Sequence, residues 1–253
     1  MKHILRLAIA LALMTTTSAV ADAQNALRMA AACAPRAVTA PLPIDALRLI
    51  GAQDSVVRQL FGTGDLVVIG GGRARGVELG QQYFVRRQVS SRNRTGPHAV
   101  STAGWIRVVA VDDTTSIALV DFACDGLLAG DHLDPYVALA LPPDANLTDT
   151  QGELDFSAPG RLLFGDNERT SGAVGDFMVT DLGQTRGAAA GTRFAIYRNA
   201  LVPGLPLTAV GEAIVVFADP ETSVVRLTRA RDAVYGGDLL IPRRRQGSEP
   251  AAR

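Results

Sequence analysis

Short apolar runs separated by turn-forming residues set the pattern of this chain. Four runs, 66–69, 82–87, 105–111 and 116–122, are rich in β-branched and aromatic residues. In the second run, the alternation around Tyr83 and Val85 predicts a strand with one buried face. The aspartates of VDDTTS, between the last two runs, favour a turn, so we expect a hairpin there. The segment 42–60 fits either a short helix or an edge strand.

Residues from Arg48 onward have a second copy that begins at Arg161. Both copies share the order Gly-Asp, an apolar run, and then G-x-x-x-G-x-aromatic-x-aliphatic-x-R. The corresponding pairs are Gly64-Asp65 and Gly175-Asp176, Gly76 and Gly187, Gly80 and Gly191, Arg87 and Arg198, Gly104 and Gly211, and Gly130-Asp131 and Gly237-Asp238. A period of about 110 residues is too long for a solenoid repeat. The sequence therefore predicts two copies of one small domain.

Each copy holds about five short strands, and a sheet of this size must close or expose its edges. We therefore expect an all-β protein with two small, mostly antiparallel β-barrels or sandwiches. The expected order is a signal peptide (1–23), an N-terminal extended segment (24–47), β-domain 1 (48–139), a linker (140–160), β-domain 2 (161–242) and a disordered tail (243–253).

The shared glycines raise the question of a phosphate-binding loop. Such a loop needs a helix behind it, whose N-terminal N–H groups bind the phosphate. Here strand-like runs follow Gly80 and Gly191, and the second copy lacks G-x-G-x-x-G. We expect these glycines to provide positive φ in tight turns. The aspartates after Gly64, Gly130, Gly175 and Gly237 are expected to accept backbone N–H groups in turns.

The shared motif resembles repeats of known bacterial envelope proteins. The pattern G-D, G-x-x-x-G, an S-x-A-x-V strand and a terminal G-D-x-L-x-P is similar to repeats that accompany LysM peptidoglycan-binding modules. It is also similar to the small C-terminal domain of flagellar assembly protein T. The resemblance implies a β-fold and a place in the envelope, and it supplies no catalytic residues.

Export is predicted from the first residues. Lys2 and Arg6 supply positive charge, an apolar run reaches Met14, and Ala21-Asp22-Ala23 is a small-x-small cleavage site. The apolar run is shorter than the roughly 20 residues that span a bilayer. We therefore expect a periplasmic or secreted protein, cleaved near Ala23, without a transmembrane segment in the mature chain.

Charge and cysteine content add two expectations. The full chain has 25 basic and 25 acidic residues, so it has no global field to attract nucleic acid. Its two cysteines, Cys33 and Cys124, suggest one disulfide in an oxidising compartment, the alternative being two separate buried thiols.

The loop 88–103 of the first copy is the best candidate for binding. It contains Arg92, Arg94 and His98, and Arg86 leads into it. Loops on a rigid barrel often carry binding residues, and basic side chains here suit an anionic glycan, a lipid head group or an acidic partner. Trp105 fits either a packing residue or a platform on which a sugar stacks. The alternative interpretation of the loop is a solvated hairpin tip.

Catalysis is not expected. Histidine is scarce, and neither a nucleophile motif nor an aspartic-protease triplet occurs. We expect no cofactor and no metal. The predicted function is a non-enzymatic envelope binding or scaffold protein whose partner is an envelope protein or peptidoglycan. The alternatives are a cell-wall or polymer hydrolase with carboxylates in the interdomain groove, and an accessory factor of a flagellum or secretion system.

Overall fold

The computed structural model describes residues 24–38, 43, 45–54, 57–89, 97–199 and 204–244, and the predicted signal peptide lies outside them. The chain divides into two compact units, Met1–Ala32 and Cys33–Arg253. In the first unit, residues 24–32 form a helix, which corrects the expectation of an extended segment. These residues are mostly Ala, Leu, Met and Arg, which have high helix propensity.

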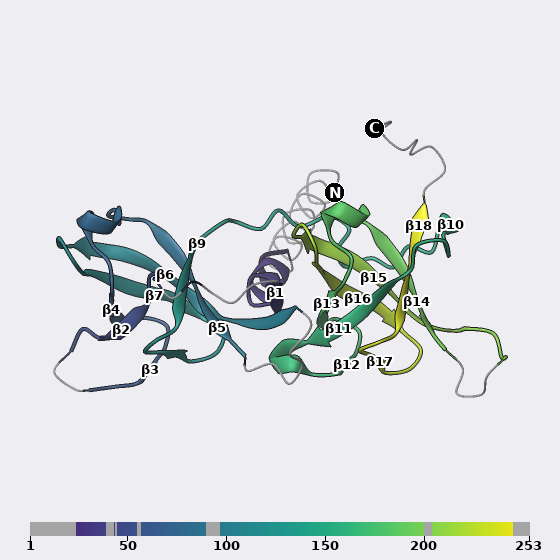
Figure 1. The fold of residues 1–253 in the computed structure, drawn as a ribbon, viewed down its shortest axis with the longest axis horizontal. Coiled ribbons are helices and arrows are strands. Elements are labelled where there is room, and N and C mark those ends of the chain that lie inside the picture. Colours follow the sequence, from purple (N-terminus) through teal and green to yellow (C-terminus); the bar gives the residue numbers. More distant parts are fainter. Residues whose placement is uncertain are drawn as a thin grey trace, which may run out of the picture. The chain divides into compact units, whose positions relative to one another are not determined.

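Domain 1 of the second unit is a curled antiparallel sheet (Figure 1). Its strands are β2 (Leu49–Ala52), β4 (Leu66–Ile69), β5 (Gln82–Gln88), β6 (His98–Val111), β7 (Ser116–Ala123) and β9 (His132–Pro135). They lie in the order β2-β4-β7-β6-β5-β9, and β1 (Arg36–Val38) pairs with β6. A bridge from Arg48 to His132 links the two edges of the sheet. β3 (Leu60–Phe61) and β8 (Leu127–Leu128) form a separate small pair.

Domain 2 is a closed barrel. Its six strands are β11 (Gly160–Gly165), β13 (Phe177–Thr180), β14 (Arg193–Arg198), β15 (Thr208–Ala218), β16 (Ser223–Ala230) and β18 (Leu239–Arg244). Closure comes from β18, which pairs with both β11 and β14. β12 (Ser171–Gly172) pairs with β17 (Val234–Tyr235). The prediction of an all-β, two-domain protein is confirmed.

The two domains pair their strands in the same register. Val68 of β4 lies opposite Ile117 of β7, and the corresponding Val179 and Val224 lie opposite each other in domain 2. A register shift between β5 and β6 recurs at the corresponding place between β14 and β15. Because even the irregularities recur, the two domains are copies of one fold.

Each domain encloses its own apolar core. Tyr83 and Val85 of β5 point into the core of domain 1, and Phe194 and Ile196 occupy the same places in domain 2. Burial of one such side chain stabilises the fold by about 1.5–3 kcal/mol. The prediction of one buried face for β5 is incomplete, since Phe84 and Arg86 on its outer side are buried as well.

The start of the predicted disordered tail is ordered, and it pairs with the linker. β10 (Glu153–Leu154) pairs with Arg243 and Arg244 at the end of β18, so that strand runs two residues past the predicted boundary. Arg243 also binds Glu212 through hydrogen bonds of 2.8 and 3.1 Å. Ion pairs therefore anchor residues that have no apolar side chain to bury. The segment 42–60 provides an edge strand, β2, in its described part.

Candidate functional site

Asp131 and Asp238 serve the same structural purpose in their domains. Each carboxylate accepts a backbone N–H three residues before it, at 2.8 Å, from Leu128 and Tyr235 respectively. Each is also bound by the arginine shared by the copies: Arg87 at 2.7 and 2.9 Å, and its domain 2 counterpart at 2.7 and 2.8 Å. Their backbone oxygens then join the ends of the sheet, Asp131 O accepting from Leu49 N at 2.9 Å. These carboxylates hold turns at the place where the two ends of each sheet meet.

Asp65 and Asp176 bind turns as well. Asp65 accepts the N–H of Gly62 at 2.8 Å, and Asp176 accepts that of Ala173 at 2.9 Å. The N–H of Gly62, reinforced by Arg58, lowers the pKa of Asp65 below its ordinary value. A general acid needs the opposite shift, because it must hold a proton near neutral pH.

Four pairs of shared glycines occupy turns, as the sequence predicts, whereas the fifth pair, Gly104 and Gly211, lies inside β6 and β15. Gly64, Gly76 and Gly80 have φ of 90°, 74° and 81°, and their counterparts Gly175, Gly187 and Gly191 have 96°, 82° and 90°. Gly130 and Gly237 both have 95°. Gly76 ends the 3₁₀ helix η1 (Arg73–Arg75), as Gly187 ends η3 (Gln184–Arg186). A strand follows each turn, so the N-terminal helix that a phosphate loop needs does not begin at these glycines.

Arg86, predicted to belong to a solvent-facing binding site, is buried inside the protein. Its side chain is 4% exposed, and its guanidinium lies 4.3 Å from the Phe84 ring and binds Thr102. Nε is 3.5 Å from Asp134. Burial, and then the positive charge of Arg36, lower the pKa of Arg86 to about 9. Arg86 therefore cannot serve as a solvent-facing contact.

Arg36, on β1, belongs to the same cluster, and no motif in the sequence marks it for this role. Its guanidinium lies 3.8 Å above the Phe217 ring and 3.6 Å from Asp219, both in domain 2. Burial lowers the pKa of Arg36, while Asp219 and then Asp134 oppose the shift. Two arginines and two aspartates therefore balance each other's charge, which is how buried ions are tolerated.

Trp105 is a packing residue. It is 7% exposed and stacks on Phe122, with ring centroids 4.8 Å apart and planes at 18°. Phe84 meets it edge-on at 6.3 Å, and Tyr136 lies at 6.1 Å. Because other aromatic rings surround the indole, its face is not presented as a platform for a sugar.

Of the remaining basic candidates, the structure places only His98, as well as His132 on β9. Arg92 and Arg94 lie outside the described residues. His98 begins β6, where it pairs with Val38 of β1. His132 lies on β9, where its Nε2 is buried without a hydrogen-bond partner, and burial, then Arg48, lower its pKa.

The predicted disulfide is present. Cys33 and Cys124 are bonded, with Cα atoms 5.6 Å apart and a sequence separation of 91. The alternative of two buried thiols is thereby excluded. The bridge ties the start of the second unit to the end of β7. A disulfide of this kind fits a protein outside the reducing cytoplasm.

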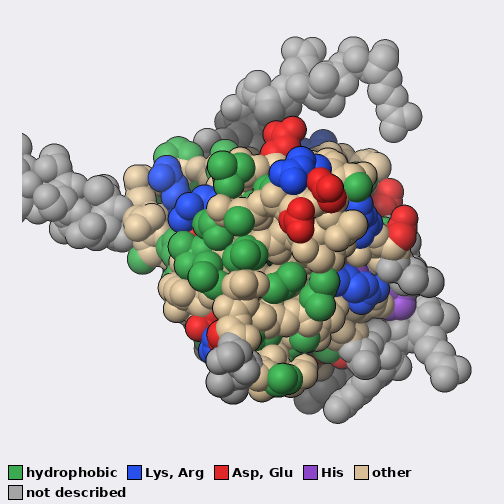
Figure 2. All heavy atoms as spheres, turned by 90° about the vertical axis from the view of Figure 1, so that its left-hand side faces the viewer, with side chains coloured by type: hydrophobic (Ala, Val, Ile, Leu, Met, Phe, Trp, Pro, Cys, Tyr) green, Lys and Arg blue, Asp and Glu red, His purple; other side chains and the backbone are tan. Residues whose placement is uncertain are grey.

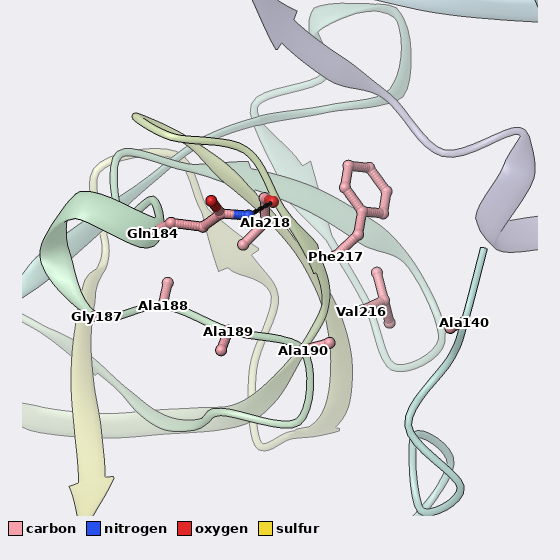
Figure 3. A pocket seen from close by; sticks show the side chains of 9 residues that line it. All are labelled: Ala140, Gln184, Gly187, Ala188, Ala189, Ala190, Val216, Phe217 and Ala218. Carbon is pink, nitrogen blue, oxygen red and sulfur yellow. Dashed lines mark hydrogen bonds between the residues drawn. The ribbon is translucent and has the colours of Figure 1, made fainter. Parts of the chain in front are cut away.

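A pocket of about 410 Å³ lies on domain 2 (Figure 3). Alanines 188–190 form one wall, and Val216 and Phe217 of β15 lie opposite, with Ala140 beside them. Gln184 donates a hydrogen bond to Ala218 O at 2.7 Å. None of the residues that line this pocket is titratable, so it suits an apolar group and not acid–base chemistry.

Sequence reasoning also missed Arg193, which is 6% exposed and holds the linker. It binds the Asp144 carboxylate at 2.5 Å and Leu147 O at 2.7 Å. A comparison of the two copies could have found it. Arg193 corresponds to Gln82 in the first copy, and this difference coincides with the contact that Arg193 makes with the linker.

Two absences concern only the described part of the chain. No group of three or more His, Cys, Asp or Glu side chains there is arranged to hold a metal ion. No helix among those residues has the length and apolar character needed to cross a membrane. Comparisons with known proteins do not assign the chain to a family, because no family model and no curated protein matches its sequence.

Proposed function

We propose that this protein is a non-catalytic binding or scaffold protein of the bacterial envelope, acting in the periplasm. The oxidising location is supported by the Cys33–Cys124 bridge and by the signal peptide that the first 23 residues predict. The duplicated barrels supply rigid surfaces for other envelope components, either proteins or peptidoglycan.

One observation carries the non-catalytic part of this proposal. The carboxylates that recur in both domains are engaged by backbone N–H groups, and Asp131 and Asp238 by arginines as well. A catalytic carboxylate must reach substrate and exchange a proton with it. Here the carboxylate oxygens already accept hydrogen bonds within the fold, so a substrate could reach them only by displacing a turn N–H or an arginine. The recurrence of these residues is accounted for by the fold alone.

The location is tested by fractionating cells that produce the full chain. We expect the protein in the periplasmic fraction, with a mature N-terminus at Gln24 by mass spectrometry. Recovery of the uncleaved chain in the cytoplasm would contradict the proposal.

The binding role is tested by co-sedimentation with purified peptidoglycan and by crosslinking to envelope proteins. Replacing Arg92 and Arg94 with alanine tests the predicted basic loop, and Arg229→Ala, an exposed arginine of domain 2, is the matched control. Hydrolysis of the cell-wall polymer by the purified protein, lost in Asp131→Asn without loss of thermal stability, would replace this proposal with the hydrolase alternative.

A further inference from the structure

The outer face of domain 1 is an apolar sheet surface open to solvent. We define it by Ile50, Leu66, Val68, Val109, Ile117 and Leu119, on β2, β4, β6 and β7. Across β4 and β7, Leu66 lies opposite Leu119, and Val68 lies opposite Ile117. Ile50, Leu66 and Val109 are 55%, 41% and 37% exposed. Figure 2, which views the molecule from the left of Figure 1, where these strands are labelled, shows hydrophobic side chains gathered between charged ones.

Domain 2 has the same face, but there it is covered. The counterparts of Val68, Val109 and Ile117 are Val179, Val216 and Val224, which are 0%, 1% and 2% exposed. The small side chains of Ala34 and Ala37, around β1, pack on them in one apolar cluster. Leu141 from the linker joins the same cluster. Because the two domains share their strands and their register, they present equivalent outer faces. The face of domain 2 is covered by another segment, and that of domain 1 is not.

The segment that covers domain 2 has a recognisable chemistry. It is extended, its alanines allow its backbone to approach the flat sheet, and Arg36 reaches Asp219 at 3.6 Å in the turn that follows β15. Asp219 corresponds to Asp112, which lies in the equivalent turn of domain 1 with its side chain 81% exposed and 3.9 Å from Arg73. Asp112 and Asp219 therefore place a carboxylate at the same edge of the outer face of each domain.

We infer that the outer face of domain 1 binds an extended segment of another envelope protein, one with small apolar residues and an arginine that reaches Asp112. The inference rests on the proposed binding role and names the chemistry of the partner. The occupant is not this chain's own 34–37 segment, because that segment pairs with β6 and covers domain 2. The same holds for the corresponding segment of a second copy.

The two outer faces differ at the position of Leu119, and this difference suggests a substitution that the fold should tolerate. Leu119 corresponds to Arg226, which lies at the same register position in domain 2 and donates to Ala145 O at 3.4 Å. Leu119→Arg therefore places a charge in the apolar face without introducing a residue that the barrel cannot hold. Val174→Arg, at a residue of domain 2 that is 57% exposed, is the matched control.

The experiment uses the full oxidised chain and a synthetic peptide with the sequence of residues 34–38, APRAV. Amide shifts of the ¹⁵N-labelled protein are followed as the peptide is added at millimolar concentration. We expect saturable shifts confined to β2, β4, β7, the end of β6 around Val109, and the 112–115 turn. Leu119→Arg should weaken binding by roughly tenfold or more, because an unpaired charge would be buried against apolar groups. Val174→Arg should bind like the wild type.

A second comparison tests the charge. Replacing the peptide's arginine with alanine should weaken binding to the wild type, and Asp112→Asn should abolish that difference. The absence of saturable shifts on this face, or equal binding by Leu119→Arg, would overturn the inference. Concentration-dependent self-association in sedimentation equilibrium that Leu119→Arg abolishes would assign the face to a second copy and also overturn it. The proposed function fails separately, if fractionation finds the chain in the cytoplasm.

Discussion

Replacement of Asp131 with alanine tests whether the recurring aspartates hold the fold or perform chemistry. In the structure this carboxylate accepts hydrogen bonds from Arg87 Nε at 2.9 Å, Arg87 Nη2 at 2.7 Å and Leu128 N at 2.8 Å. The variant removes all of them and leaves a positive charge without its partner. We expect domain 1 to lose stability.

The size of the loss follows from these contacts. Hydrogen bonds to a charged group contribute about 1.5–3 kcal/mol each. The side chain of Arg87 is 28% exposed and that of Asp131 is 5% exposed. In the variant, water can therefore replace some of the hydrogen bonds that Arg87 loses. The free energy of unfolding should therefore fall by about 3 kcal/mol. For a domain of this size that lowers the Tm by roughly 10–20 °C.

The assay is calorimetry combined with urea denaturation of the purified, oxidised chain. Asp238→Ala should give a similar loss in the transition of domain 2, because its contacts are the same. Asp113→Ala is the control, since its side chain is 80% exposed beside Arg73 and such pairs contribute less than about 1 kcal/mol. Losses below about 1 kcal/mol in both Asp131→Ala and Asp238→Ala, with binding or turnover abolished, would refute the structural role.

Three further predictions concern other contacts. Replacing Cys33 and Cys124 with serine opens a loop whose ends are 91 residues apart and should cost about 4–5 kcal/mol in urea denaturation, matching the reduced wild type. Burial lowers the pKa of His132, so below pH 6.5 the unfolded chain binds more protons than the folded one. Stability should therefore fall as the pH drops from 7 to 5, and His132→Leu should flatten this slope; an unchanged slope would contradict the assignment. Gly104→Ala should destabilise by about 3 kcal/mol, because a Cβ would lie 2.2 Å from a backbone oxygen of β7, whereas Gly51→Ala meets nothing within 4 Å and should be near neutral in thermal melts.

The strand runs, the duplication and the turn glycines could be predicted from sequence because their causes are local. A glycine with positive φ and an aspartate that binds an N–H three residues earlier act within a single turn, so each copy carries its own evidence. Gly76 and Gly187 illustrate this, since both occur in the same short pattern and both end a 3₁₀ helix. The disulfide was suggested by composition and compartment, but only the bond between the two sulfur atoms in the structure excluded separate thiols.

What the tertiary structure decided depends on residues far apart in the chain. From the sequence, Arg86 is expected to be a surface cation. In the structure it is buried beside Arg36 and Asp134, which lie about 50 positions before and after it in the chain. Likewise, Val68 and Val179 have the same local pattern, but only Val179 is fully buried, in an apolar cluster that includes Ala34, Ala37 and the linker residue Leu141. A hydrophobic pattern specifies which side chains leave water, but not which distant segment covers them, because contact area depends on where the whole chain brings its parts together.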